Sequence, residues 1–325
     1  MKAHIRPNYH IMTSCDGRLL DQLSILIYSI SRNLKDAHTD FYVITRKTYD
    51  DKFEMLTALC NKLKNITFHN IIIPDAELYD ELGKYGGGWV GEAYFSFCAH
   101  LFKEFENVDR AMYLDAGDVI VANDISKYYN DDFEGKSLIV QSARYKTQNN
   151  TNVLFEQSDL QTENFAGIAR GLFNSGSYIM NLKKMREDGL TINDYLYVTS
   201  VLVNSFGSDN HNIYWGDQGL LSIAFAGDMK AYRYNEIRNI WYMPYNFCMW
   251  YYDGMNRKPD YTPSVIHFAG GLKPWRVEYP IFTERFQKKE ELHNISELKI
   301  GQAEWYYLWH EYAMITDNLL TELGY

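Results

Sequence analysis

The stretch Ala111-Met112-Tyr113-Leu114-Asp115-Ala116-Gly117-Asp118-Val119-Ile120-Val121 is an apolar run interrupted by two carboxylates and a glycine. A buried strand cannot hold ionised aspartates cheaply, so Asp115 and Asp118 are expected where a strand ends, facing solvent or a cation. Two oxygen donors on a short turn suit Mg²⁺ or Mn²⁺, which usually keep positions open for substrate phosphates. Alternatively, each aspartate merely ends a strand or caps a turn, as aspartate often does. This stretch alone leaves both interpretations open.

The residues before this stretch alternate between strand and helix patterns. Residues 9–17 predict a strand that runs into an Asp-Gly turn, and residues 41–45 predict a second strand. Between them, Leu19 to Leu34 place apolar side chains every three or four positions, which predicts an amphipathic helix. A strand, helix, strand order implies an α/β protein with a largely parallel sheet and ligands at the carboxyl edge of that sheet.

The same patterns continue along the chain. They predict helices over residues 50–63, 76–84, 90–105 and 183–202, a helix that opens at 215–221, and strands over 66–73, 137–141, 172–182 and 264–271. Apolar residues between Trp305 and Leu323 predict a C-terminal amphipathic helix, explained by core packing or by a partner helix rather than by membrane binding.

Composition describes a globular protein with a surplus of aromatic side chains. Of 325 residues, 46% are hydrophobic and 23% charged, which excludes disorder and allows a full core. The chain has 27 Tyr and 7 Trp, which suit either an aromatic-rich core or a cleft for sugar rings or bases. The formal net charge of −10 disfavours general binding to nucleic acid or anionic membranes, so an anionic ligand would need a local cation.

Cysteine spacing and the absence of long apolar segments predict a cytoplasmic location. Cys15, Cys60, Cys98 and Cys248 show no metal-ligand spacing and predict free thiols in a reducing compartment. The polar start of the chain shows no secretion signal, and no apolar segment approaches membrane-spanning length. We therefore expect membrane contact only through an acceptor substrate.

Three segments without regular periodicity are candidates for binding loops. Gly86-Gly87-Gly88 predicts a loop or hinge rather than a phosphate loop, since no Lys-Ser/Thr follows it. Residues 146–170 are polar and long enough to form a lid or binding loop, and residues 240–253 gather aromatics suited to a cleft wall. Acceptor choice is expected to depend on these last two segments and the C-terminal segment.

Two further polar groups join the carboxylate pair. Asp217-Gln218 begins a predicted helix, where Asp217 alone would be an ordinary N-cap. His267 lies on a predicted strand and is followed by Gly270 and Lys273. A single histidine is more often structural. Here, however, the imidazole would complete a metal shell, the glycine would let an anion approach the backbone, and the lysine would neutralise phosphate.

These motifs resemble those of the family 8 glycosyltransferases, which include bacterial lipopolysaccharide α-galactosyl- and α-glucosyltransferases and the glycogenins. The resemblance covers roughly residues 9–276. The matching segments are Tyr113-Leu114-Asp115 to Val121, Phe173-Asn174-Ser175-Gly176 through Asn181-Leu182, Asp217-Gln218, and His267-Phe268-Ala269-Gly270-Gly271-Leu272-Lys273-Pro274-Trp275. The segment that begins at His267 is the most specific of them.

The resemblance implies a GT-A type nucleotide-sugar-binding domain over residues 1–276, with a helical extension over 277–325 packed on it. It implies a retaining hexosyltransferase that uses Mn²⁺ or Mg²⁺ and a UDP-sugar. Galactose or glucose would be transferred to a saccharide, glycolipid or protein-linked glycan. Transfer would follow a front-side route in which the departing phosphate is the base.

The resemblance also implies a role for each matching residue. The metal ligands would be Asp115, Asp118 and His267, and the diphosphate contacts would be Gly270 and Lys273. The nucleotide would be contacted by Thr13, Ser14 and Cys15, with Ala116 beside the donor. The sugar would be contacted by Asn174, Asp217 and Gln218. Gln218 would lie near the reacting carbon as an orienting or charge-stabilising group, and Asp217 is the alternative nucleophile.

The chain departs from the family pattern in two places. The family spaces its carboxylates as Asp-x-Asp, whereas Asp115-Ala116-Gly117-Asp118 has one extra residue, which a glycine bulge would accommodate. The family also has an acidic residue at the end of the first strand and a basic residue on the helix before the metal strand. Here Cys15 and residues 93–100 do not supply them, although Asp16 lies one place further on.

Two other classes of function compete with the transferase. A haloacid dehalogenase phosphatase also places aspartates after an apolar strand, but its pair lies near the N-terminus as Asp-x-Asp. A catalytically inactive, nucleotide- or sugar-binding relative is the second alternative, because of the altered carboxylate spacing.

Overall fold

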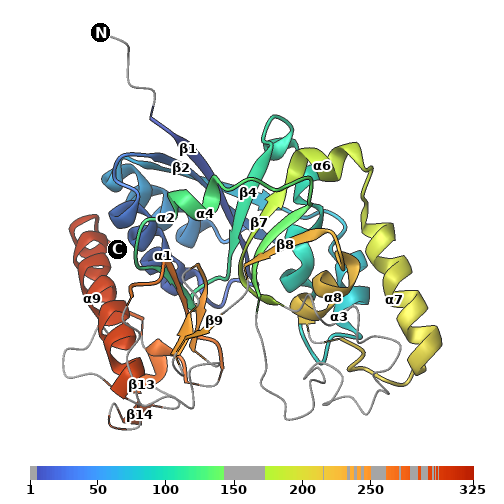
Figure 1. Cartoon of the computed structure of the whole chain (residues 1–325). Coiled ribbons are helices and arrows are strands. Elements are labelled where there is room, and N and C mark those ends of the chain that lie inside the picture. Colours follow the sequence, from blue (N-terminus) through green and yellow to red (C-terminus); the bar gives the residue numbers. More distant parts are fainter. Residues whose placement is uncertain are drawn as a thin grey trace.

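A central sheet runs through the protein in a computed structural model (Figure 1). The structure describes residues 6–142, 173–214, 216–232, 235–237, 240–242, 245–249, 261–270, 272–278, 285–286, 292–294, 296, 298 and 300–325. Within these ranges the sheet has seven strands in the order β3-β2-β1-β4-β7-β6-β8. They are β1 (Asn8–Ser14), β2 (His38–Thr45), β3 (Ile66–Ile72), β4 (Arg110–Leu114), β6 (Leu138–Ser142), β7 (Phe173–Asn181) and β8 (Met229–Tyr232).

Most of these strands are parallel, as the strand and helix order predicts. Strands β3, β2, β1 and β4 form parallel pairs, and so do β6 and β8. Only β7 runs against its neighbours β4 and β6 among the described pairings of this sheet. The carboxyl ends of β1, β2 and β4 therefore meet at one edge, where ligands bind in sheets of this kind.

Each strand divides its side chains between two hydrophobic cores because successive residues point to opposite faces. In β1, Ile11 packs in one core and Met12 in the other; in β4, Leu114 and Tyr113 divide in the same way. Helices α1 (Leu20–Asn33), α2 (Asp50–Leu63) and α9 (Ile300–Glu322) cover the first face. The second is covered by α3 (Ala76–Gly83), α6 (Leu182–Glu187), α7 (Ile192–Phe206), α8 (Gly216–Ala224) and the 3₁₀ helices η1 (Gly91–Leu101) and η2 (Lys103–Phe105).

The quoted carboxylate stretch forms two strands in two different sheets. β4 ends at Leu114, and β5 (Val119–Val121) joins a second sheet in the order β11-β12-β5. In that sheet, β12 (Val265–His267) runs antiparallel to β5, with His267 opposite Val119. The remaining described elements are α4 (Ser126–Tyr129), η6 (Pro274–Arg276), β9 (Asn235–Ile237), β10 (Ile240–Tyr242), β11 (Phe247–Cys248), β13 (Val277–Glu278) and β14 (His293–Asn294).

The predicted C-terminal helix is present as α9, which lies against α1 and α2 (Figure 1). Trp309 is fully buried in the first core, and its ring centroid lies 6.2 Å from that of Trp275. The Asn33 amide donates to the Val121 carbonyl at 2.8 Å and to the Tyr312 hydroxyl at 3.2 Å. Core packing therefore accounts for the apolar face of this helix, while the division at residue 276 stays a prediction.

Some predicted elements differ in detail from the structure. The predicted helix over 90–105 consists of η1 and η2, and the helix over 183–202 is split between α6 and α7 by a turn at Gly189, whose φ is +69°. The predicted loop 146–170 lies outside the described residues. Of the predicted cleft wall at 240–253, the described Tyr245 and Phe247 are buried in the core.

The structure describes the four cysteines and shows whether its helices reach membrane-spanning length. The four cysteines, all among the described residues, form no disulfide and are buried. Among the described residues, no helix has both the length and the apolar character needed to cross a membrane. The cytoplasmic location itself stays a prediction.

Truncating Trp309 should test how strongly α9 is held. Trp309→Ala is expected to lower the free energy of unfolding by about 3–5 kcal/mol, the usual cost of removing a buried tryptophan. Tyr307→Ala, on the same helix with 46% of the side chain exposed, should change it by less than about 1 kcal/mol. Urea denaturation of both variants measures the difference, and equal losses would contradict the packing described for α9.

Candidate functional site

The turn between β4 and β5 brings the two predicted carboxylates to the same side. The Asp115 amide donates to the Gly176 carbonyl at 3.1 Å, which ties the start of the turn to β7. Gly117 has a φ of +83°, and a Cβ there would lie 3.1 Å from the Leu19 Cβ. Both the left-handed backbone and the limited room for a Cβ favour glycine at this position. The tight turn at Gly117 therefore accommodates the one extra residue between the two carboxylates, compared with the Asp-x-Asp spacing of the family.

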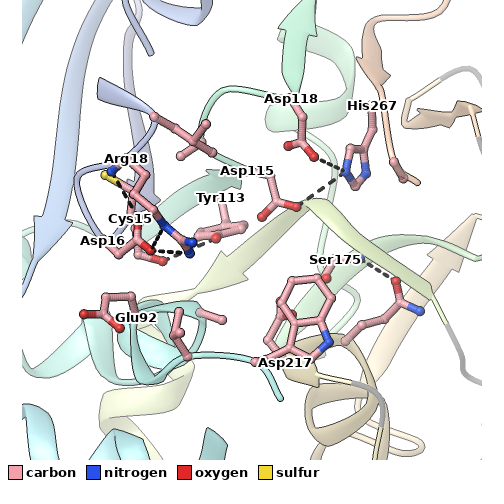
Figure 2. A pocket seen from close by; sticks show the side chains of 18 of the residues that line it. Cys15, Asp16, Arg18, Glu92, Tyr113, Asp115, Asp118, Ser175, Asp217 and His267 are labelled. Carbon is pink, nitrogen blue, oxygen red and sulfur yellow. Dashed lines mark hydrogen bonds and ion pairs between the residues drawn. The ribbon is translucent and has the colours of Figure 1, made fainter. Parts of the chain in front are cut away.

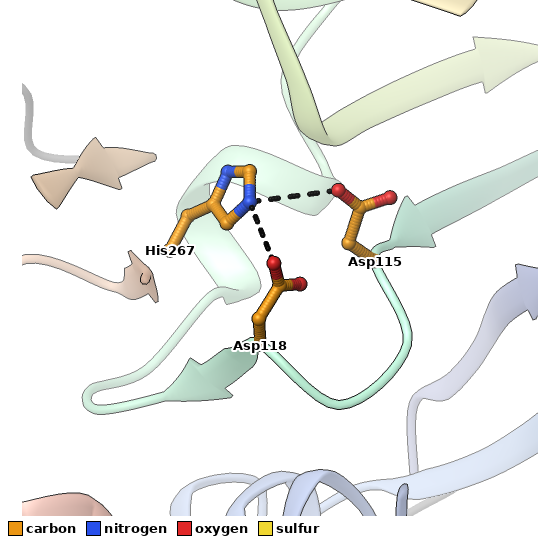
Figure 3. A group of neighbouring side chains, drawn as sticks. All are labelled: Asp115, Asp118 and His267. Atoms are coloured by element: carbon orange, nitrogen blue, oxygen red, sulfur yellow. Dashed lines mark ion pairs between the residues drawn. The ribbon is translucent and has the colours of Figure 1, made fainter. Parts of the chain in front are cut away.

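His267 completes a three-residue cluster with these carboxylates (Figure 3). Its Nε2 atom lies 3.5 Å from an oxygen of Asp115 and 3.5 Å from an oxygen of Asp118. One ligand atom from each of the three side chains lies within 4.8 Å of the other two. The pairing of β5 with β12 produces this meeting, because it sets His267 beside the end of the carboxylate turn.

The other ring nitrogen of His267 is held by β7. Its Nδ1 lies 2.7 Å from Oδ1 of Asn174, an oxygen that also accepts from the Asn246 amide at 3.0 Å. Because an amide oxygen only accepts, this contact places a proton on Nδ1. In the neutral imidazole, the lone pair on Nε2 would then point toward the two carboxylates and be available to a cation. A Cβ on Gly176 would lie 2.0 Å from Nδ1, so glycine is required at this position for the ring to fit.

The two carboxyls have opposite electrostatic environments. Burial and the charge of Asp118 raise the pKa of Asp115. Burial would also raise the pKa of Asp118, but the Lys273 ammonium and His267 outweigh it and hold that pKa well below its usual range. Lys273 forms an ion pair with Asp118 and donates to the Phe268 carbonyl at 3.0 Å. The cluster therefore concentrates negative charge with one ammonium beside it.

A second polar group lies at the start of α8. The Gln218 side-chain oxygen accepts from the Asn174 amide at 3.2 Å and from the Ser175 backbone at 3.3 Å. Asp217 is only 5% exposed, and burial raises its pKa to about 6 although a hydrogen bond from Ser175 opposes the shift. Asn174 thus connects this group to His267.

The predicted residues gather around one cavity of about 620 Å³ (Figure 2). Eleven of the twelve predicted site residues line it: Ser14, Cys15, Asp115, Ala116, Asp118, Asn174, Asp217, Gln218, His267, Gly270 and Lys273. Thr13 does not, because its side chain points into the protein and is completely buried. Burial raises the pKa of the Cys15 thiol to about 11, so the thiol is protonated at neutral pH.

Several residues that line the cavity were missed by the sequence analysis. Arg18 lies on the turn after β1, and its Nε donates to Asp16 at 2.5 Å. Glu92 on η1 is paired with Arg46 at 2.7 Å, and the exposed side chain of Trp89 lies at the opening of the cavity. The sequence signal for Arg18 is its position just after the predicted Asp16-Gly17 turn, at the ligand edge of β1.

The fold defines a class of protein. The mostly parallel sheet and its flanking helices match the structure of the galactosyltransferase LgtC, solved with donor and acceptor sugar analogues. The TM-score is 0.64 at 18% identity, over 94% of this chain and 95% of that one. The glycosyltransferase GlyE of Streptococcus pneumoniae TIGR4 gives a TM-score of 0.57 at 16% identity, over 98% and 63% of the two chains. The protein has the GT-A fold of glycosyltransferases.

Residues 10–278 match the model of the family described as Glycosyl transferase family 8. The chain therefore belongs to glycosyl transferase family 8, as the motifs predict. A curated relative is Glycosyltransferase GlyF of Streptococcus pneumoniae serotype 4 (strain ATCC BAA-334 / TIGR4), 24% identical over 271 residues. The match covers 82% of this chain but only 57% of the length of that relative.

The contact between Gly176 and the His267 ring gives a test of the cluster geometry. Gly176→Ala should displace the imidazole from the two carboxylates. A cation held by the three side chains, tested with Mn²⁺, should then bind more than about tenfold more weakly. In a double-mutant cycle, Gly176→Ala added to His267→Ala should cause almost no further loss. Electron paramagnetic resonance of free Mn²⁺ measures each affinity, and additive losses would show that Gly176 acts independently of the ring.

Proposed function

We propose that this protein is a metal-dependent retaining glycosyltransferase that moves a hexose, galactose or glucose, from a UDP-sugar to a saccharide or other hydroxyl acceptor. The observation that supports this most is the meeting of Asp115, Asp118 and His267, with 3.5 Å between Nε2 and each carboxylate. The cluster lies in the wall of a cavity that also contains Lys273 and Gln218.

The cluster suits a divalent cation by its chemistry. Two carboxylate oxygens and one imidazole lone pair converge, and their mutual repulsion would be relieved by a positive ion between them. An oxygen-rich set with one nitrogen fits Mn²⁺ and, less closely, Mg²⁺. A bound ion would act as a Lewis acid that neutralises charge on the departing diphosphate.

The side chains of Lys273 and Arg18 would add positive charge at the diphosphate. Both residues, together with Gly270, line the main cavity and a smaller adjoining one of about 230 Å³. Gly270 has a φ of +100° and open space where a Cβ would project, so its backbone is accessible to an anion. Arg18 would supply the cation that the family usually places on the helix occupied here by η1.

The remaining cavity residues would position the sugar and the nucleotide. Ser14 and the protonated Cys15 thiol, at the end of β1, are hydrogen-bonding groups for the nucleoside. Asn174 and Gln218 would orient the hexose, and Gln218 would lie near the anomeric carbon. A front-side route needs only such positioning, with the departing phosphate accepting the proton of the acceptor hydroxyl.

The competing classes lose support. Family membership disfavours a phosphatase. The case for an inactive relative depends on the extra residue in the carboxylate stretch, yet the turn at Gly117 leaves both carboxylates within reach of His267. We also propose that residues 1–276 are the catalytic domain and residues 277–325 an extension, since the family match ends at 278.

Removing one carboxylate should abolish transfer. Asp118→Ala is expected to lower turnover of UDP-galactose and UDP-glucose at least about a thousandfold in Mn²⁺, because a metal ligand and the Lys273 partner are both lost. Asp109→Ala, at a carboxylate that is 76% exposed, is the matched control and should retain activity. The proposal fails if the wild type turns over UDP-sugars equally well in Mn²⁺ and in excess chelator.

Asp217 separates the two routes to retention. If Asp217 only positions the sugar, Asp217→Asn should slow transfer by less than about a hundredfold, and mass spectrometry of the enzyme with donor should show no glycosylated protein. A nucleophile would instead lose about ten-thousandfold or more. Trapping of a hexose on Asp217 would replace the front-side route with a double displacement.

A further inference from the structure

Trp89 is a large aromatic side chain at the opening of the cavity. It lies between α3 and η1 and keeps 49% of its surface exposed, although it lines the same cavity as Asp217 and Gln218. An indole has a broad apolar face and one N–H donor, so a half-exposed indole in the lining of a cavity is a surface suited to a ligand. None of the predicted roles uses this residue.

The indole lies flat against a glycine next to the sugar-binding group. A Cβ on Gly216 would lie 2.9 Å from the indole Nε1 and 3.0 Å from two of its carbons. Gly216 also has a φ of +57°, in the left-handed region where glycine is favoured. One face of the ring is therefore set against the first turn of α8, adjacent to Asp217.

Backbone hydrogen bonds hold the loop that presents Trp89. The Gly216 amide donates to the Gly86 carbonyl at 3.1 Å, and the Gly87 amide donates to the His211 carbonyl at 2.9 Å. The glycine triplet is thus a loop anchored to the segment before α8. The indole is held in place before any ligand arrives, which lowers the entropic cost of binding.

The position of Trp89 relative to the cation cluster indicates which sugar it would meet. Contacts lead from His267 to Asn174, from Asn174 to Gln218, and through the start of α8 to the indole. The diphosphate end of a donor would lie at the cluster, and its hexose beside Gln218. Trp89 lies beyond the positions of the diphosphate and the hexose, on the solvent side of the cavity, where a second saccharide would enter.

We propose that the indole of Trp89 is the stacking surface for a pyranose ring of the acceptor saccharide. This inference rests on the proposed transferase function and adds the acceptor subsite to it. The apolar C–H face of a pyranose packs on an aromatic ring, and the ring's hydroxyls stay free for Asp217 and for solvent. The hydroxyl edge of the acceptor would then lie toward the reacting carbon.

The test uses the full chain with UDP and Mg²⁺ and a set of simple saccharides: methyl α- and β-galactopyranoside, methyl α- and β-glucopyranoside, lactose and maltose. Saturation-transfer NMR measures their affinity, and hydrolysis of UDP-galactose and UDP-glucose without acceptor gives the donor KM. The variants are Trp89→Ala, Trp89→Phe and, as a matched exposed aromatic outside the cavity, Tyr197→Ala, whose side chain is 69% exposed.

Trp89→Ala should weaken binding of at least one saccharide roughly tenfold, the size of one aromatic contact, and at least fivefold more than it changes the donor KM. Trp89→Phe should restore most of the affinity, and Tyr197→Ala should match the wild type. The inference is overturned if Trp89→Ala binds saccharides as the wild type does, if the wild type binds none of them, or if donor KM rises in equal proportion. Absence of both UDP binding and UDP-sugar hydrolysis in the wild type would instead remove the proposed function itself.

Discussion

The antiparallel pairing of β5 with β12 is the constraint on which the site depends. It joins residues that are about 150 positions apart in sequence and sets His267 beside the turn that contains Asp115 and Asp118. A shift of one residue in this register would turn the imidazole to the other face of the small sheet. The backbone bond from Phe268 to the Asp118 carbonyl, at 2.8 Å, helps to keep the register in place.

Small residues make the close approaches around this pairing possible. Gly176 on β7 leaves room for the imidazole, Gly117 allows the left-handed turn between the carboxylates, and Gly216 allows the indole of Trp89 to lie beside Asp217. Each glycine comes from a different element, and each is next to a residue with a proposed role. The shape of the site is therefore determined as much by missing Cβ atoms as by polar side chains.

Much of the fold could be predicted from the sequence because its signals are local. The spacing of apolar residues from Leu19 to Leu34 and the strand patterns beside it predict the parallel sheet, and the carboxylate stretch predicts a strand end. The meeting of the three cluster residues came from the family resemblance and not from spacing, since strand register between β5 and β12 is a tertiary property. Ser14 lines the cavity and Thr13 does not, because adjacent residues of β1 point to opposite faces.

The missed residues depend on contacts that no local pattern encodes. Trp89 lines the cavity because the glycine loop is bonded to the segment before α8. Glu92 lines it while paired with Arg46, which directly follows β2. An aromatic or acidic residue in a sequence carries no sign of such neighbours.

Anomalous diffraction at the manganese edge, from crystals grown with Mn²⁺ and UDP, tests the central claim most directly. The account predicts one strong peak within about 2.0–2.4 Å of Asp115, Asp118 and Nε2 of His267, with diphosphate oxygens completing the coordination. A peak bound elsewhere, or ordered UDP in the cavity with no metal at these three side chains, would contradict it.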